Sequence, residues 1–160
     1  MRFDMSKIIK LILCIALCQA AGIVGSIFTF ESVTTWYLTL SKPFFNPPNW
    51  IFGPVWTTLY TLMGISLFMF WISKGKNKKR GYKIFFAQLI LNTIWSIMFF
   101  GLQSPAAGLL IILILLTFIA LTIKEFRKVS KPAAYLLIPY IAWVSFASIL
   151  NLSIFLLNSK

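Results

Sequence analysis

The side chains that could carry chemistry in this chain are aromatic rings and amides that recur every three or four residues within long apolar runs. Trp56 and Tyr60 are one such pair, and Asn92 and Trp95 are another. In a helix this spacing puts both side chains of a pair on one face. Indole and phenol rings offer broad apolar surfaces, and an amide adds one acceptor and two donors. The pattern suits ligand recognition better than acid–base catalysis.

Three predicted helical faces share this character. They are Gly53, Trp56, Tyr60 and Gly64 in one run, Gln88, Asn92, Trp95, Ser96 and Phe99 in the next, and Tyr140, Trp143, Ala147 and Asn151 in the last. Because an amide or an indole N–H is costly in hydrocarbon unless it is paired, we expect these faces to look inward. Singly, each aromatic ring is also explained by packing and each Asn by a bond between helices. Jointly they indicate a site.

Metal-dependent and acid–base chemistry lacks the residues that it needs. The chain has no His, and its acids are Asp4, Glu31 and Glu125, all at or beyond the ends of apolar runs. Coupled transporters normally hold an ionisable group at membrane depth, and metal centres need ligand clusters. Cys14 and Cys18 lie one turn apart and are expected to be buried thiols. The sequence therefore predicts no metal and no required cofactor. A bound haem would lack its usual His ligand, so any tetrapyrrole would have to be held by its faces and edges and not through iron.

Composition places the chain in a membrane. Of its 160 residues, 59% are hydrophobic and 11% are charged, with a mean hydropathy of +0.88. Runs long enough to cross a bilayer occupy about residues 8–30, 50–73, 82–101, 106–123 and 133–157. They lack the alternation of barrel strands, so helices are expected. The predicted fold is an all-α integral membrane protein, a bundle of five transmembrane helices in one domain over residues 1–160.

The positive charges predict the orientation of this bundle. The net charge is +12, and with five spans all Lys and Arg residues except Lys42 and Lys160 fall on the side of the N-terminus. Short cytoplasmic connections carry such an excess. We therefore expect a multi-pass protein of a prokaryotic plasma membrane, with the N-terminus inside and the C-terminus outside. Topology accounts for the charge, so no nucleic-acid partner is predicted.

Two spans carry further expectations about packing. Small residues repeat at every fourth position of the first span, as Cys14, Cys18, Gly22 and Ser26, which would let another span or another protomer approach closely. The fourth span is Leu and Ile on all sides from Gly108 onward. It is expected to be the most lipid-exposed helix and to contribute least to any site.

The connection at about residues 31–49 is unusually rich in aromatic residues and prolines. Pro restricts the backbone, so the segment is predicted to form a structured lid over the proposed site. Its candidate residues, taken as far as the start of the next span, are Trp36, Lys42, Pro43, Phe45, Pro47, Pro48 and Trp50.

Ordered motifs along nearly the whole chain resemble one known family. They are Trp36-Tyr37, Lys42-Pro43, Asn46-Pro47-Pro48, Trp50, Phe52-Gly53-Pro54-Val55-Trp56-Thr57, Leu59-Tyr60, Asn92, Trp95, Phe99-Phe100-Gly101, Pro139-Tyr140, Trp143, Phe146-Ala147 and Leu150-Asn151. The chain is similar to the translocator protein family, also called tryptophan-rich sensory proteins or peripheral benzodiazepine receptors, and looks like a bacterial or archaeal member.

This resemblance implies a function and a set of site residues. It implies a bundle, often dimeric, whose first loop closes over a pocket for porphyrins such as protoporphyrin IX and for synthetic isoquinoline or benzodiazepine-type ligands. The matching pocket positions are Trp56, Asn92, Trp143 and Ala147, with Tyr60, Trp95, Phe99, Tyr140 and Leu150 as neighbouring wall. Two alternatives stay open. One is light-dependent porphyrin degradation that uses Trp56 and Trp143, and the other is passive transport of a small molecule.

Two positions depart from the pattern of the relatives. Phe44 and Phe45 stand where relatives commonly carry at least one Trp, which puts indole chemistry from the lid in doubt. Leu152 replaces the Tyr of a pattern that is associated with cholesterol in animal members. Cholesterol binding is therefore not carried over to this chain.

Overall fold

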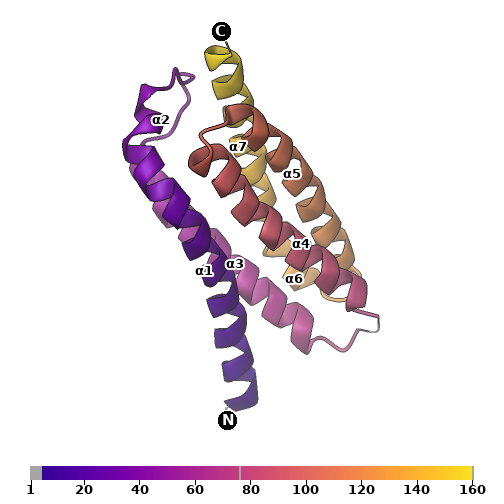
Figure 1. Cartoon of the computed structure of the whole chain (residues 1–160). Coiled ribbons are helices and arrows are strands. Elements are labelled where there is room, and N and C mark those ends of the chain that lie inside the picture. The colour runs from indigo at the N-terminus through magenta and orange to yellow at the C-terminus, as the bar shows by residue number, and fades with distance from the viewer. Residues whose placement is uncertain (1–4, 76, 160) are drawn as a thin grey trace.

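The computed structural model describes residues 5–75 and 77–159, and the described chain is helical with short connections (Figure 1). In chain order the elements are α1 (Met5–Thr34), α2 (Trp36–Thr39), the 3₁₀ turn η1 (Asn49–Ile51), α3 (Phe52–Ile72), α4 (Lys79–Ser96), the π turn η2 (Ile97–Gly101), α5 (Pro105–Arg127), α6 (Lys131–Tyr135) and α7 (Ile138–Asn158).

Among the described residues, five helical segments are long and apolar enough to cross a membrane. They are α1, η1 with α3, α4 with η2, α5, and α6 with α7. The predicted five-helix membrane fold is thus confirmed. The first helix ends later than predicted: the backbone stays helical to Thr34, and the hydroxyls of Thr34 and Thr35 donate to the carbonyl of Glu31 at this end. The lid between the first two spans is therefore shorter than predicted and contains α2.

Side chains and prolines define where the later helices begin. At the start of α5 the Ser104 hydroxyl accepts a hydrogen bond from the backbone N–H of Ala107, and Pro105 follows at the first helical position. The last span was predicted as one helix but is broken between α6 and α7. Pro139 stands in the first turn of α7, where its missing N–H costs little, and the residue before a Pro disfavours continued helix.

Helices α1 and α3 pack on each other, and α5 packs against both α4 and α7 (Figure 1). The contact of α1 with α3 depends on Gly64, since a Cβ there would lie 2.5 Å from the Cα atom of Ile15 and 3.0 Å from the carbonyl oxygen of Cys14. Gly22 leaves room for the ring of Tyr60 in the same way. The small-residue ridge of the first span therefore faces another span of the same chain at these points.

The expectation that the fourth span is the most exposed is wrong for the described chain. In α5, 28% of the apolar window is buried within the protein, against 17% in α1. Flanked by two helices, α5 buries Ile112, Leu115 and Ile119, whereas the N-terminal end of α1 extends beyond its neighbours (Figure 1). Composition alone therefore misjudged which helix faces the lipid most.

The lid and the C-terminal end of α7 lie at one end of the bundle, and the N-terminal end of α1 lies at the other (Figure 1). The Asn158 side chain joins the lid to α7, since its amide donates to the carbonyl of Ser41 at 2.9 Å and accepts from the N–H of Ser41 at 3.0 Å.

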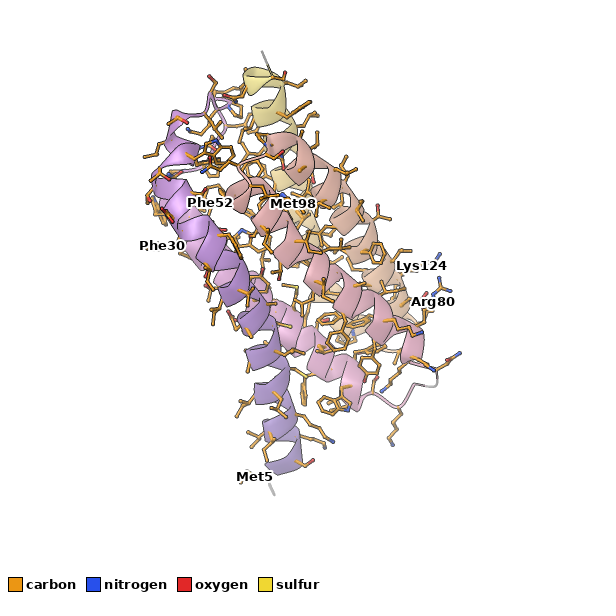
Figure 2. All side chains as sticks on the ribbon, in the orientation of Figure 1. Met5, Phe30, Phe52, Arg80, Met98 and Lys124 are labelled. Atoms are coloured by element: carbon orange, nitrogen blue, oxygen red, sulfur yellow. The ribbon has the colours of Figure 1, made fainter. Side chains whose placement is uncertain are left out.

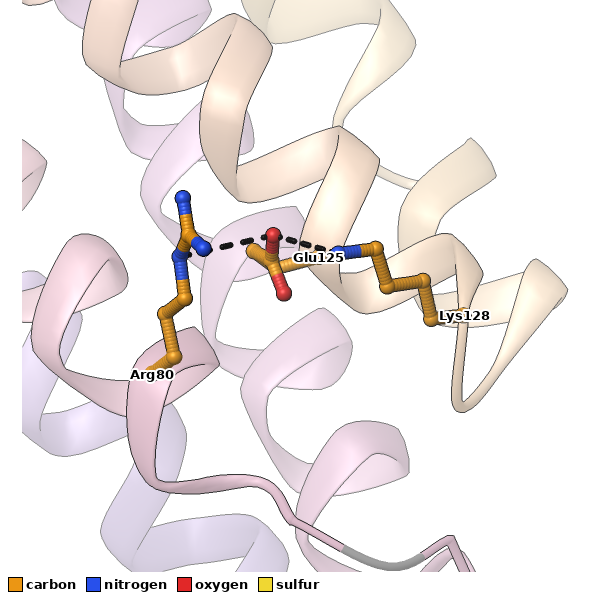
Figure 3. A network of polar contacts seen from close by, with 3 residues as sticks. All are labelled: Arg80, Glu125 and Lys128. Carbon is orange, nitrogen blue, oxygen red and sulfur yellow. Dashed lines mark hydrogen bonds and ion pairs between the residues drawn. The ribbon is translucent and has the colours of Figure 1, made fainter.

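At the opposite end of the bundle from the lid, Glu125 pairs with Lys128 at 2.7 Å and with Arg80 at 3.6 Å (Figure 3). These contacts fasten α4 to α5 where the basic connections gather.

Replacing Gly64 by Ala should separate α1 from α3. The new methyl group would press on backbone atoms, which cannot rotate away, so we expect a loss of about 1–3 kcal/mol in unfolding free energy. Denaturation in mixed micelles measures this change. Gly53→Ala is the matched control, because a Cβ at Gly53 meets no heavy atom within 4 Å. Equal stability of the two variants would contradict the close helix contact.

Candidate functional site

A cavity of about 210 Å³ lies between α1, α3 and α4 on the lid side of the bundle. Its lining is mostly apolar and aromatic with a few polar groups, and consists of Gln19, Gly22, Ile23, Ser26, Thr29, Phe52, Gly53, Trp56, Thr57, Tyr60, Asn92, Trp95, Ser96 and Phe100. Ile23, Gly53 and Thr57 are exposed on the outside of the bundle. The cavity therefore reaches the surface that the bundle turns toward lipid.

Trp56 is the central ring of the cavity wall. Its ring centroid lies 5.7 Å from that of Tyr60, 6.0 Å from that of Trp95 and 6.4 Å from that of Tyr140. Such separations are typical of favourable aromatic pairs. Helical spacing within α3 and α4 thus brings three of the predicted residues, Trp56, Tyr60 and Trp95, to one wall, with Tyr140 behind them.

Asn92 holds two tyrosines in place. Its Oδ1 accepts a hydrogen bond from the Tyr60 hydroxyl at 2.5 Å, and its Nδ2 donates to the Tyr140 hydroxyl at 2.9 Å. The Tyr140 hydroxyl in turn donates to Oε1 of Gln88 at 2.9 Å. Asn92 is only 1% exposed, so this network joins α3, α4 and α7 inside the protein. Asn92 was predicted as a ligand contact. In the structure its amide orients the ring of Tyr60 at the cavity wall.

A second amide orients Trp95. The indole Nε1 donates to Oδ1 of Asn151 at 3.3 Å, and Nδ2 of Asn151 donates to the carbonyl of Pro105 at 2.9 Å. On its other side Trp95 stacks with Phe99, with centroids 5.7 Å apart. Phe99 belongs to the π turn η2, where the N–H of Leu102 bonds to the carbonyl of Ile97 at 2.8 Å. The wide turn therefore places Phe99 behind Trp95 and outside the cavity lining.

The remaining fifth-span residues do not line the cavity. Ala147 and Leu150 are buried in the helix packing. Trp143 packs its ring against Phe52 at 6.2 Å and Phe146 at 5.4 Å. Among the described residues, Nε1 of Trp143 is the buried side-chain donor that has no acceptor. Phe52, which lines the cavity and contacts Trp143, connects this indole to the site.

Tyr37 anchors the lid to the bundle. It is 2% exposed, and its hydroxyl donates to Oδ1 of Asn46 at 2.6 Å across the lid. Its ring lies against Phe52, Phe99 and Phe100. Burial raises the pKa of Tyr37 to about 12, so the phenol stays protonated and keeps donating at physiological pH. The lid therefore sits directly on the cavity residue Phe52, at the end of the bundle where Figure 2 labels it.

The predicted lid residues occupy different places. Trp36 packs on Phe99 at 5.6 Å and Phe45 on Phe146 at 6.3 Å, whereas Trp50 is 73% exposed. Pro43 and Pro47 are partly buried, and Pro48 is exposed.

Lys42 closes the end of α2. Its ammonium donates to the carbonyl of Tyr37 at 2.7 Å and of Leu40 at 2.9 Å, and it lies 5.0 Å from the centre of the Tyr37 ring. Cations are favourable at a helix C-terminus. The ammonium thus stabilises the lid and is not directed at the cavity.

Sequence reasoning missed the contribution of α1. Gln19, Gly22 and Thr29 line the cavity, and Nε2 of Gln19 donates to the carbonyl of Thr57 at 3.0 Å and to Oγ1 of Thr61 at 2.9 Å. A polar and small stripe at positions 19, 22, 26 and 29 was the available signal, of which only the small members were noticed. Phe52 and Phe100 were also missed as lining residues, whereas Ser96 lies on the predicted inward face of the third span and does line the cavity.

Metal-binding groups are not assembled in the part of the chain that the structure describes. No cluster of three His, Cys, Asp or Glu side chains occurs there. Cys14 and Cys18 are buried free thiols on α1. The site can therefore offer rings, amides and hydroxyls to a ligand.

Comparison with known proteins assigns the chain to a family. The model of the TspO/MBR family matches residues 14–157. The tryptophan-rich protein TspO of Archaeoglobus fulgidus is 51% identical over 153 residues, covering 96% of this chain and 99% of the relative. That of Chlorobaculum tepidum is 50% identical, covering 95% and 98%, and the human translocator protein is 37% identical, covering 80% and 78%. The chain belongs to the TspO/MBR family of multi-pass membrane proteins.

Proposed function

We propose that this protein is a membrane receptor for porphyrins such as protoporphyrin IX and for related apolar aromatic ligands. The observation that carries the proposal is the aromatic cavity walled by Trp56, Tyr60 and Trp95, whose lining residue Phe52 is in contact with Tyr37 of the lid. Flat rings gain dispersion energy between such walls, and a few oriented polar groups fix their position. The homologues named translocator protein and tryptophan-rich sensory protein support a role in handling a membrane-soluble ligand.

The cavity must widen to enclose a porphyrin. Its volume of about 210 Å³ lies below the range of about 300–1,000 Å³ that is usual for ligand sites. Phe52 stands between the cavity and Trp143, whose buried indole N–H lacks an acceptor among the described residues. We infer that rotation of Phe52 joins the two regions, so that a ligand oxygen can accept from Trp143. This step would bring Trp143 and the neighbouring Ala147 into the site predicted for them.

The setting of this receptor is part of the proposal. We place it in a prokaryotic plasma membrane with the N-terminal end of α1 in the cytoplasm, on the strength of the Lys and Arg distribution. We also propose a homodimer, as the family resemblance implies. No cofactor is needed for binding, because the ligand would be held by side chains alone.

Filling the cavity mouth should weaken porphyrin binding without unfolding the protein. Gly53 lines the cavity, and a side chain added there has open space, so Gly53→Leu should occupy the mouth. We expect the Kd for protoporphyrin IX, measured by saturable quenching of Trp fluorescence in nanodiscs, to rise about tenfold or more. Thr58→Leu, on the same helix but outside the lining, should leave the Kd unchanged. An unchanged Kd for Gly53→Leu would place the site elsewhere.

Light-dependent porphyrin breakdown is the second candidate function. The adjacent indoles of Trp56 and Trp95, with centroids 6.0 Å apart at the cavity, favour it, because oxidisable rings would lie against an illuminated porphyrin. Trp143 stands farther back, behind Phe52.

Single Trp variants separate the roles in this second function. If breakdown occurs in the cavity, Trp56→Phe should slow it about tenfold, whereas Trp143→Phe should slow it less, because Trp143 is reached only after the rotation of Phe52 inferred above. Absorbance of the porphyrin and of its product under illumination with oxygen measures the rate, and a dark sample is the control. Full turnover in the Trp56→Phe, Trp143→Phe double variant would end this assignment.

Passive transport is the remaining alternative. The described cavity opens at the side of the bundle between α1 and α3, which favours a receptor over a channel across the membrane. A net porphyrin flux into liposomes that rises with the amount of this protein in the membrane would favour transport instead.

A further inference from the structure

A second hollow lies at the opposite end of α1 from the lid and has no assigned role. We call it the basic-end groove. It has a volume of about 390 Å³ and is lined by Leu13, Cys14, Leu17, Leu67, Trp71, Tyr82 and Phe86. It shares no lining residue with the aromatic cavity. Its walls belong to α1, α3 and α4, and Leu13, Leu17 and Trp71 are exposed to the surroundings of the bundle. Within a membrane this groove is open to lipid.

Positive side chains stand at one end of the basic-end groove. On α1, Lys10 precedes Leu13 by three residues, and on α4, Lys83 precedes Phe86 by three residues, so each cation shares a face with a groove residue. Both helices begin at the N-terminal end of the bundle (Figure 1), so both cations lie toward that end. The Lys10 ammonium lies 5.5 Å from the centre of the Trp71 ring, directly at the groove wall.

These cations lack a carboxylate partner within the described residues. The ion pairs found there are those of Glu125 with Arg80 and Lys128. Arg80 and Lys124 are drawn on the side of the bundle away from α1 (Figure 2). Within residues 5–75 and 77–159, Lys10 and Lys83 therefore offer positive charge at the groove without a carboxylate counter-ion, which is the complement of an anionic headgroup.

The groove is about one helical turn long. On α1 it runs from Leu13 to Leu17, which is about 6 Å along the helix axis. That length fits the first carbons of an acyl chain and not a whole chain. An apolar groove gains no hydrophobic energy over bulk lipid, so shape and headgroup charge must decide what fills it. The charges named above select a negative headgroup.

We propose that the basic-end groove binds an anionic glycerophospholipid of the surrounding leaflet. The upper part of one acyl chain lies between Leu17, Leu67 and Phe86, and the phosphate lies near Lys10 and Lys83. A second copy of this chain fits the groove less well. A two-fold contact there would bring the Lys10 and Lys83 residues of both copies together, and like charges oppose such a contact.

Quenching by brominated lipids tests the proposal. The protein is placed in nanodiscs of unlabelled lipid with a small fraction of phosphatidylglycerol or phosphatidylcholine that is brominated near the headgroup. The Trp71 contribution is obtained by subtracting the fluorescence of Trp71→Phe. We expect phosphatidylglycerol to quench Trp71 with a higher relative affinity than phosphatidylcholine, by roughly fivefold for each participating lysine.

Charge variants show whether the named lysines carry this preference. Lys10→Gln with Lys83→Gln should equalise the two lipids at Trp71. Lys124→Gln with Arg127→Gln removes the same charge from α5 and should leave the preference unchanged, because neither residue shares a helix with the groove. Leu17→Phe, which fills the groove, should reduce quenching by both lipids. Thermal melting of each variant verifies that it folds.

Three results would overturn the proposal. The first is equal quenching of Trp71 by the two lipids in the unmodified protein. The second is a preference that Lys124→Gln with Arg127→Gln removes as fully as Lys10→Gln with Lys83→Gln, because the basic end would then attract lipid only as a diffuse charge. The third is a loss of lipid preference in a dimer-stabilised sample, which would assign the groove to a second copy.

Discussion

Paired amides and tyrosine hydroxyls are the constraint on which the inner part of this bundle depends. Hydrocarbon offers no partners to a polar group, so Asn92 and Gln88 each need one inside the protein. Tyr60 and Tyr140 supply these partners from two other helices. The same bonds fix the angle of the Tyr60 ring at the cavity wall. Packing and recognition therefore rest on one set of interactions.

The close contact of α1 with α3 forms the α1 wall of the aromatic cavity, to which these hydrogen bonds do not extend. Gly64 lets the backbone of α1 approach, and Gly22 receives the Tyr60 ring. On the lid side of this crossing the helices enclose the aromatic cavity, and on the side of the N-terminal end of α1 they leave the basic-end groove. One crossing point thus divides α1 into two surfaces with different neighbours: aromatic rings and amides toward the lid, and alkyl groups with lysines toward the N-terminus.

Much of the fold and part of the candidate site could be predicted from the sequence. The spans followed from hydropathy, and spacing within a helix, which is a local property, put Trp56 with Tyr60 on one face and Asn92 with Trp95 on another, both of which line the cavity. The share taken by α1 was missed, because it depends on how closely two helices approach, and that is set by Gly64 far along the chain. The position of Trp143 depends on the break before α7 and on the Phe52 ring, which no periodicity encodes.

The bond between Asn158 and Ser41 has a consequence for how a molecule reaches the cavity. It ties the middle of the lid to α7, while the start of the lid continues directly from α1, so the lid is held at two places. The cavity lining is exposed at Ile23 and Thr57, so the cavity opens at the side of the bundle that faces the lipid. A molecule arriving there comes out of the bilayer, so occupancy follows its partition coefficient between lipid and water as much as its contacts with the protein.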